Sequence, residues 1–393
     1  MIWFLFLYLI SFPFGQLASF QLFPQARIHL IDVFAAILVL AYLSDILWKR
    51  LPVKKQTKTN QVSFSGPLFS FLAIAAFTLT LGSVYENPKT ILVGGMYLGR
   101  LALYVLLYKA IAHTLNLEKK KEELRETLYN SLIILGFFIS LIGLVGYFLY
   151  PDTKALSEYG WDNHYYRLIG PFLDPAFTGI LIVLSLVAIW FKGWKTTGWQ
   201  AVAFVLFLIN WIALALTYSR ASFVGAAAFF LTAFVVQRKL ILISAVTALF
   251  ILTYYLLPHP NKSTGTDLGR TQTISSRFDN YKNAINIAKD NPLFGVGYNL
   301  FKPSLQNDEK LVHAGSGIHS SLLFVLTTTG VVGLLVYLVF WAKVIQYSWW
   351  AKEGKFAKVL LCSVAALLAH SLFDNSLFYP WVMGWLAILL AIQ

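Results

Sequence analysis

Long runs of apolar residues recur along the whole chain, and polar residues gather in the segments between them. Each run is about 20 residues long, the length that an α-helix needs to cross the hydrocarbon core of a bilayer. The pattern predicts an all-α integral membrane protein with about twelve transmembrane helices. The predicted spans are residues 1–20, 28–48, 65–84, 91–113, 128–150, 173–191, 199–217, 221–237, 240–257, 319–342, 357–373 and 380–393.

The composition supports a membrane protein. Hydrophobic residues make up 58% of the 393 residues and charged residues only 12%, against roughly 25% charged residues in an average soluble domain. The 12 Trp, 20 Tyr and 32 Phe residues are typical of the aromatic belts at membrane interfaces. The single cysteine, Cys362, excludes an internal disulfide, a cysteine-based zinc site and an iron–sulfur cluster.

The basic residues predict the orientation. With the N-terminus in the cytoplasm, the inner segments carry 18 of the 31 Lys and Arg residues. Most outer basic residues lie in one long loop, which counts little for orientation. We therefore expect a multi-pass protein of the bacterial cytoplasmic (inner) membrane with both termini cytoplasmic. The dispersed net charge of +13 is expected to face membrane lipids and not nucleic acid.

Two outer segments, residues 151–172 and 258–318, are too long to be simple turns, and long connections usually carry function. We accordingly divide the chain into N-terminal transmembrane helices, residues 1–150, and a second region, residues 151–393, that contains both loops.

The larger loop is predicted to be ordered and to lie on the outer membrane surface. Ser276 and Asp279 have the spacing of a capping box, which predicts the start of an amphipathic helix, and residues 290–292 predict its end. Gly295 and Gly297 indicate a tight turn. The predicted apolar face of the helix consists of Phe278, Tyr281, Ile285 and Ala288.

The common motifs of soluble enzymes are missing from the sequence, including the phosphate-binding loop and the zinc-protease and serine-hydrolase signatures. The outer acidic residues are scattered and lack the spacing of a metal–diphosphate site. We therefore expect no cofactor and no metal. The candidates that remain are arginines and histidines of the outer segments.

Five short strings contain these candidates, in a fixed order around the large loop. They are Arg-x-x-Gly-x-Phe-x-Asp-Pro at 167–175, Ser-Arg at 219–220, Ser-Arg…Asn-Pro-Leu-Phe-Gly-Val-Gly at 276–297, His-Ser-x-Leu…Gly-x-x-Gly at 319–333, and His370…Asp374. In this order they resemble the O-antigen ligase and polymerase superfamily of bacterial envelope glycosyltransferases, over about the C-terminal two thirds of the chain. The chain departs from that pattern at Ser320, where the family often has Asn.

The resemblance implies a GT-C-like helical enzyme of the O-antigen ligase type. Such enzymes move a glycan from a polyprenyl (undecaprenyl) diphosphate carrier to an acceptor hydroxyl on the outer face, by an inverting reaction that needs no metal. The acceptor would be a lipid, a wall polymer or a protein. A polymerase of the same superfamily is the alternative. A polysaccharide transporter or flippase is less favoured, because transporters place their polar groups near the bilayer midplane.

The resemblance and the chemistry together assign roles to the candidate residues. A leaving diphosphate builds up negative charge, and the planar fork of arginine suits phosphate oxygens. We assign this role to Arg167, Arg220, Arg270 and Arg277. His319 is the candidate base, because a histidine at a helix N-terminus stays neutral and can accept a proton. His370, Asp374 and Asp174 are the candidate supporting residues.

Each assignment has a structural alternative. An arginine at the end of a span can be an interfacial anchor, and Arg167 can close its loop by pairing with Asp174. His370 and Asp374 have the spacing of a pair on one helix face. Arg100 lies inside a predicted span, where a charge needs a partner, and Asp32 is the expected one. His259 and His313 receive no role.

The predicted topology can be tested by labelling single cysteines at Lys262 and Lys55 in intact cells, with Cys362 replaced by serine. Lys262 should react with a membrane-impermeant reagent and Lys55 should not. Equal reactivity at both positions would contradict the topology.

Overall fold

The computed structural model describes residues 1–23, 26–49, 64–159, 161–194, 196–258, 260, 264–301 and 317–393. The described chain is mostly helical, which confirms the expected fold class at that level. Its α-helices are α1 (Ile2–Ser11), α2 (Leu30–Lys49), α3 (Ser65–Gly82), α4 (Pro88–Leu117), α5 (Lys121–Leu149), α6 (Pro175–Phe191), α7 (Thr197–Leu216), α8 (Arg220–Gln237), α9 (Leu242–Leu256), α10 (Gln272–Asp290), α12 (Ser321–Trp350), α13 (Lys355–Ser371) and α14 (Pro380–Ala391).

Shorter elements connect these helices. The 3₁₀ turns are η1 (Phe12–Leu17), η2 (Lys154–Tyr159), η3 (Gly170–Phe172), η4 (Thr264–Thr266) and η5 (Ser376–Phe378). Two strands, β1 (Ser19–Phe23) and β2 (Ala26–His29), pair antiparallel between α1 and α2. This hairpin is a feature that the apolar pattern did not predict.

Each predicted apolar run contains a helix, although the first run, 1–20, contains only α1, then η1 and the start of β1. Seven helices of the described chain are long and apolar enough to cross a membrane, namely α2, α3, α4, α5, α7, α8 and α12. The first run, at 2–17, and helices α6, α9 and α14 are apolar but shorter. The total of twelve spans therefore stays a prediction.

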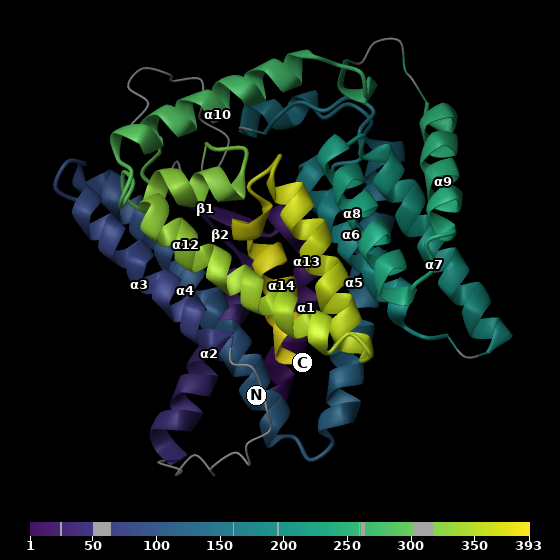
Figure 1. Cartoon of the computed structure of the whole chain (residues 1–393), viewed down its shortest axis with the longest axis horizontal. Coiled ribbons are helices and arrows are strands. Elements are labelled where there is room, and N and C mark those ends of the chain that lie inside the picture. The colour runs from purple at the N-terminus through teal and green to yellow at the C-terminus, as the bar shows by residue number, and fades with distance from the viewer. Residues whose placement is uncertain are drawn as a thin grey trace.

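Helix α6 lies in the core of the bundle, and nearly every residue of α6 is buried. A helix that is apolar on all sides is typical of such a position. It packs against α5, α7, α8 and α13. Helix α9, by contrast, has no buried residue and lies at the edge of the bundle (Figure 1).

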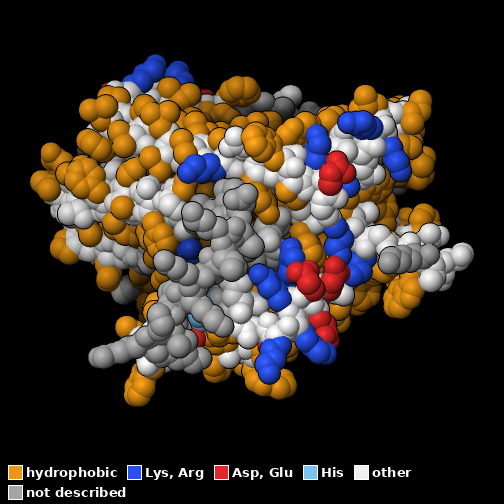
Figure 2. All heavy atoms as spheres, turned by 60° about the horizontal axis from the view of Figure 1, so that its bottom comes forward, with side chains coloured by type: hydrophobic (Ala, Val, Ile, Leu, Met, Phe, Trp, Pro, Cys, Tyr) orange, Lys and Arg blue, Asp and Glu red, His pale blue; other side chains and the backbone are white. Residues whose placement is uncertain are grey.

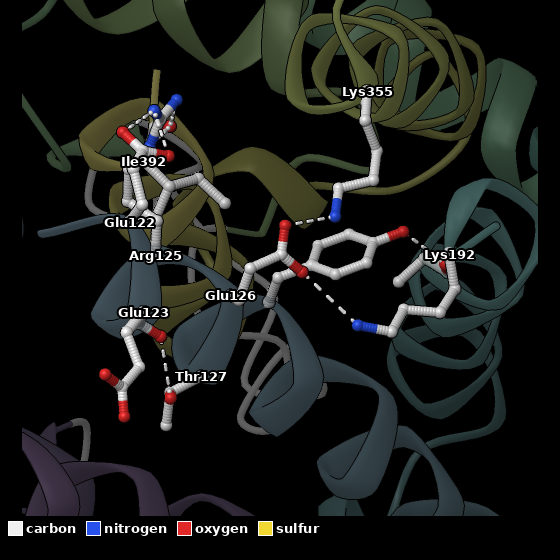
Figure 3. A network of polar contacts seen from close by, with 10 residues as sticks. Glu122, Glu123, Arg125, Glu126, Thr127, Lys192, Lys355 and Ile392 are labelled. Carbon is white, nitrogen blue, oxygen red and sulfur yellow. Dashed lines mark hydrogen bonds and ion pairs between the residues drawn. The ribbon is translucent and has the colours of Figure 1, made fainter. Parts of the chain in front are cut away.

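Charged side chains gather at the end of the bundle that carries both termini (Figure 2). There Glu126 of α5 accepts hydrogen bonds from Lys192, 3.3 Å away, and from Lys355 (Figure 3). Both ammonium groups also lie over the ring of Tyr129. Because Lys192 follows α6 and Lys355 begins α13, this network holds the ends of three helices together.

Helix α10 lies across the opposite end of the bundle (Figure 1). The prediction of a helix ending at 290–292 is confirmed. The predicted capping box was wrong, because α10 begins at Gln272 and Ser276 therefore lies inside the helix. The predicted apolar face was partly wrong as well, since the buried residues are Ala284 and Ala288, whereas Phe278 and Ile285 are exposed.

Helix α12 is broken at Gly330, where φ is +66°. The segment after α10 supplies hydrogen-bonding partners for the backbone groups at the break. The amide N–H of Val296 donates to the carbonyl of Thr327 at 3.0 Å, and that of Val331 donates to the carbonyl of Pro292 at 2.9 Å. The predicted tight turn is confirmed, because Gly295 and Gly297 both have positive φ. These bonds satisfy backbone groups that the break would otherwise leave unpaired.

Replacing Gly330 by alanine should destabilise the protein. A Cβ atom at Gly330 would lie 2.1 Å from the carbonyl oxygen of Leu293, and the positive φ adds strain. The two effects together should cost about 2–4 kcal/mol and lower the midpoint of thermal unfolding in detergent. Gly95→Ala on α4 is the control, because nothing lies within 4 Å of its Cβ position. Equal midpoints for both variants would contradict this interpretation of the break.

Candidate functional site

Four arginines converge beneath α10 at the end of the bundle away from the termini. Arg167 precedes α6, Arg220 begins α8, Arg270 precedes α10 and Arg277 belongs to α10. Burial first, and then the charges of the other three arginines, lower the pKa of Arg167 to about 9 against the opposing effect of Asp174. Burial and the charges of Arg220 and Arg277 likewise lower the pKa of Arg270. The structure thus brings together all four arginines that the sequence singled out.

Backbone carbonyls of the large loop hold the guanidinium groups of Arg220 and Arg270. Nη1 of Arg220 donates to the carbonyl of Arg270 at 2.9 Å. Nη1 of Arg270 donates to the carbonyls of Gly265 and Asp267 at 2.8 and 2.7 Å. A carbonyl fixes the position of a guanidinium without cancelling its positive charge.

Arg167 connects the 151–172 loop to the turn between α7 and α8. Its Nε donates to the carbonyl of Thr217 at 3.1 Å. The expected pairing of Arg167 with Asp174 is not the contact that holds its guanidinium. Asp174 instead caps α6, because its Oδ1 accepts from the N–H groups of Ala176 and Phe177 at 2.7 and 2.8 Å. The Asp-Pro pair of the first string is therefore a helix start, with Asp as the cap and Pro in the first turn.

Arg277 differs from the other three arginines. To the residues that the structure describes, its guanidinium makes no hydrogen bond and no ion pair. It lies close enough to lower the pKa values of His319 and Asp374. The expectation that Arg277 occupies the first turn of its helix was wrong, since α10 begins five residues earlier. Among the described residues, Arg277 is therefore the cation of the cluster whose guanidinium has no hydrogen-bonding partner.

His319 directly precedes Ser320, the cap of α12. The hydroxyl oxygen of Ser320 accepts from the N–H of Leu323 at 3.5 Å, so the serine that departs from the family pattern acts as a helix cap. Burial and, next, the charge of Arg277 lower the pKa of His319 below its usual 6.5, while Asp174 and Asp162 act in the opposite direction. The imidazole is consequently neutral at pH 7.

Asn280 positions this histidine and was missed by the sequence analysis. Its Oδ1 accepts from the backbone N–H of His319 at 3.1 Å, and its Nδ2 donates to the carbonyl of Gly317 at 2.6 Å. The hydroxyl of Tyr281 donates to the carbonyl of Leu372 at 2.7 Å. Asn280 and Tyr281 follow Arg277 by three and four residues, and this spacing on a helix is the signal that would have found them.

The expected side-chain pair of His370 and Asp374 was wrong. Helix α13 ends at Ser371, so Asp374 lies beyond it, and its backbone N–H donates to the carbonyl of His370 at 3.1 Å. Nδ1 of His370 lies 3.1 Å from the hydroxyl of Ser376. Burial, with the charge of Asp174 adding to it, raises the pKa of Asp374 to about 7.

Two further residues of the sequence analysis, His259 and His313, lie outside the described residues. Within the ranges that the structure describes, no three His, Cys, Asp or Glu side chains are grouped so that they could hold a metal ion.

The fold and the site define a multi-helical membrane protein with a basic, histidine-containing site at one end of its bundle. Residues 202–338 match the family model described as O-antigen ligase. The match confirms the resemblance, contains three of the five strings, at 219–220, 276–297 and 319–333, and covers a little over a third of the chain. It includes Arg220, Arg270, Arg277 and His319, and it indicates a membrane glycosyltransferase of the O-antigen ligase or polymerase kind. None of the curated proteins matches this chain.

The arginine cluster should bind a diphosphate anion. Inorganic pyrophosphate at 100 times its Kd should stabilise the purified protein by about 2.7 kcal/mol, visible as a higher midpoint of thermal unfolding. Arg277→Ala should lose most of this stabilisation, and Arg277→Lys should recover little because an ammonium lacks the planar fork.

Lys289→Ala is the matched control, because Lys289 is an exposed cation in the last turn of the same helix. Undiminished stabilisation of Arg277→Ala by pyrophosphate would remove Arg277 from the site.

Proposed function

We propose that this protein transfers a glycan from a polyprenyl diphosphate carrier to an acceptor hydroxyl at the outer face of the bacterial inner membrane, as an O-antigen ligase does. The observation that carries the proposal is the convergence of four guanidinium groups next to a half-buried, neutral histidine. The cations match a diphosphate leaving group, and the histidine matches a hydroxyl that must lose its proton. The match of residues 202–338 to the ligase family supports the same reaction.

The proposed step is a single displacement. The acceptor oxygen forms a bond to the anomeric carbon of the glycan while the bond from that carbon to the diphosphate oxygen breaks. The bonding electron pair leaves with the diphosphate, and the hydroxyl proton passes to the imidazole of His319. The products are the glycosylated acceptor and free polyprenyl diphosphate. Attack from the side opposite the leaving group inverts the anomeric configuration.

The arginines stabilise the charge that develops on the leaving diphosphate. Burial and, after it, their mutual repulsion lower the pKa values of Arg167 and Arg270, and a bound anion relieves this repulsion. Backbone carbonyls already fix the guanidinium groups of Arg167, Arg220 and Arg270, so these three need little reorganisation when the bond breaks. One preorganised group of this kind typically accounts for about 10²–10³ in rate. The proposed chemistry needs no metal and no cofactor.

His319 serves as the base in this proposal. A base must be unprotonated before the step, and the lowered pKa of His319 keeps its imidazole neutral at pH 7. Asn280 holds the backbone of His319, and Asp174 and Asp162 lie close enough to stabilise the imidazolium that forms. His370, Asp374 and Asp174 are assigned supporting roles, because they shape the backbone and the charge around the arginines.

The position of the site supports the proposed orientation. Both termini lie at the opposite end of the bundle from α10 (Figure 1), and the end with the termini is rich in charged side chains (Figure 2). With that end in the cytoplasm, helix α10 and the arginine cluster face the outside. The carrier-linked glycan and the acceptor meet there.

Deleting the gene and analysing the surface glycans tests the function. If the protein is a ligase, the acceptor should lose its long glycan chains, and these chains should accumulate on the carrier. If it is a polymerase, single repeat units should remain on the acceptor. Unchanged surface glycans would overturn both.

His319→Ala should lower turnover by about 10²–10⁴, the range of general acid–base catalysis, while donor binding survives. The wild-type rate should fall on the acid side below pH 6.5, where His319 becomes protonated. His319→Gln should also be nearly inactive, because an amide is not basic.

Asp374→Asn is the control for the pH profile, because Asp374 titrates at about 7. The fall in rate at acid pH should persist in Asp374→Asn. If it is absent from the residual activity of His319→Ala, the group that titrates is His319. Normal turnover of bound donor in His319→Ala, with only binding reduced, would show that His319 is not the base.

A further inference from the structure

Helix α7 ends in a strained turn at Tyr218. This residue has a φ of +50°, and its amide N–H donates to the carbonyl of Ala215 at 3.1 Å. Helices commonly end with one residue in the left-handed region, which is usually glycine because a Cβ atom is strained there. Tyr218 is instead a large side chain with no exposed surface. Strain of this kind gathers at functional sites, where the surrounding structure maintains it.

The carbonyl groups of this turn hold two arginines of the cluster. The carbonyl of Thr217 accepts from Nε of Arg167 at 3.1 Å, and the carbonyl of Tyr218 accepts from Nη2 of Arg270 at 3.5 Å. The last carbonyls of a helix have no partner within the helix and lie at its negative end, so they suit cations. Because Thr217 and Tyr218 are neighbours, their turn brings together guanidinium groups from two different loops.

The loop that carries Arg167 is fixed to the same helix end by its backbone. The N–H of Leu168 donates to the carbonyl of Leu216 at 2.8 Å. A second tyrosine in the left-handed region, Tyr166 with a φ of +49°, directly precedes Arg167. Two strained turns therefore meet where Arg167 is held.

The side chain of Tyr218 holds the start of the large loop. Its hydroxyl donates to the carbonyl of Pro258, directly after α9 and its cap. Helix α9 has no buried residue and gives this loop little support. Since Arg270 belongs to the loop that begins at Pro258, Tyr218 fixes both the loop and the guanidinium group that the loop carries.

Arg100 of α4 is held in a different way. It donates to the carboxylate of Asp32 at 2.9 Å, which confirms the partner expected from the sequence. The hydroxyl of Tyr104 donates to the same carboxylate at 3.0 Å. Asp32 thereby compensates the charge of Arg100, whereas the carbonyls at the end of α7 orient their two arginines without neutralising them.

We propose that Tyr218 is a positioning residue that sets the specificity of the arginine cluster. Its turn holds Arg167 and Arg270 side by side, so that the pair fits the two phosphoryl groups of a diphosphate better than a single phosphate. This inference rests on the proposed function and deepens it, because it names what selects a diphosphate-linked donor. Tyr218 acts through the two arginines and does not touch the anion.

The test uses the full chain in detergent and two probes, inorganic pyrophosphate and inorganic phosphate. The measured quantity is the concentration of each ion that gives half of its maximal shift in the midpoint of thermal unfolding. Tyr218→Phe keeps the ring and removes only the hydroxyl. It should raise this concentration for pyrophosphate about two- to tenfold, the range that one net hydrogen bond gives.

Tyr218→Gly removes the ring and relieves the backbone strain, so it should raise the same concentration about tenfold or more. Both variants should also lower the preference for pyrophosphate over phosphate, because guanidinium groups that are no longer held together bind the two ions more alike.

Arg238→Gly is the matched control. Arg238 ends α8 with a φ of +55°, but its side chain is exposed and lies at the other end of that helix from Arg220. Relief of strain there should leave both half-saturation concentrations unchanged. Equal losses of pyrophosphate binding in Arg238→Gly and Tyr218→Gly would overturn the inference.

The outcomes separate the inference from the proposed function. If Tyr218→Phe unfolds at a lower temperature but keeps the half-saturation and the preference of the wild type, Tyr218 only stabilises the fold and the inference is wrong. The arginine cluster still stands in that case, provided that Arg277→Ala loses its response to pyrophosphate. A wild type that pyrophosphate does not stabilise would overturn the donor site and this inference with it. Should Tyr218→Gly not fold, Tyr218→Phe decides alone.

Discussion

Repulsion among four half-buried guanidinium groups is the constraint around which this end of the molecule is organised. Burial and neighbouring cations lower the pKa of Arg167 to about 9. The fold therefore holds these like charges closer together than they would lie in water. The partners that hold them are mostly backbone carbonyls, such as those of Thr217, Gly265 and Asp267. Carbonyl dipoles fix a guanidinium in place, whereas a carboxylate would also neutralise it. The positive potential of the site is thereby kept for an anion.

Such a site needs a rigid frame, because its residues come from the loop before α6, the start of α8, α10 with the segment before it, and the residue before the cap of α12. The break of α12 at Gly330 supplies part of that frame, since the turn around Gly295 hydrogen-bonds to both sides of the break. Helix α10 supplies the rest. Asn280 is bonded to the residues before α12 and Tyr281 to the residue after α13. A shift of α10 would therefore move Arg277 and His319 together, which preserves the distance between the guanidinium and the imidazole.

The parts of this structure that follow from local patterns could be predicted from the sequence. Apolar runs located the helices, the order of the strings located the arginines, and the isolation of Arg100 in a span pointed to Asp32. The start of α10 could not be predicted, because its cap residue Thr271 makes no side-chain capping bond and the Ser276 signal lies inside the helix. The hairpin at 19–29 was hidden between two apolar runs. The end of α13 before Asp374 depends on tertiary contacts such as that of His370 with Ser376.

The two ends of the bundle use basic residues in opposite ways. At the end with the termini, Glu126 bridges Lys192 and Lys355, and its side chain is 41% exposed. Exposed pairs of this kind contribute little free energy, so the network mainly fixes which helix ends lie together. At the other end the guanidinium groups of Arg167, Arg220 and Arg270 donate to backbone carbonyls, and Arg277 has no carboxylate paired with it among the described residues. The net charge of +13 does not locate a site in this chain. The kind of partner that each cation receives does, since a guanidinium that is held by carbonyls, or that no described carboxylate pairs with, keeps its positive potential for a phosphate.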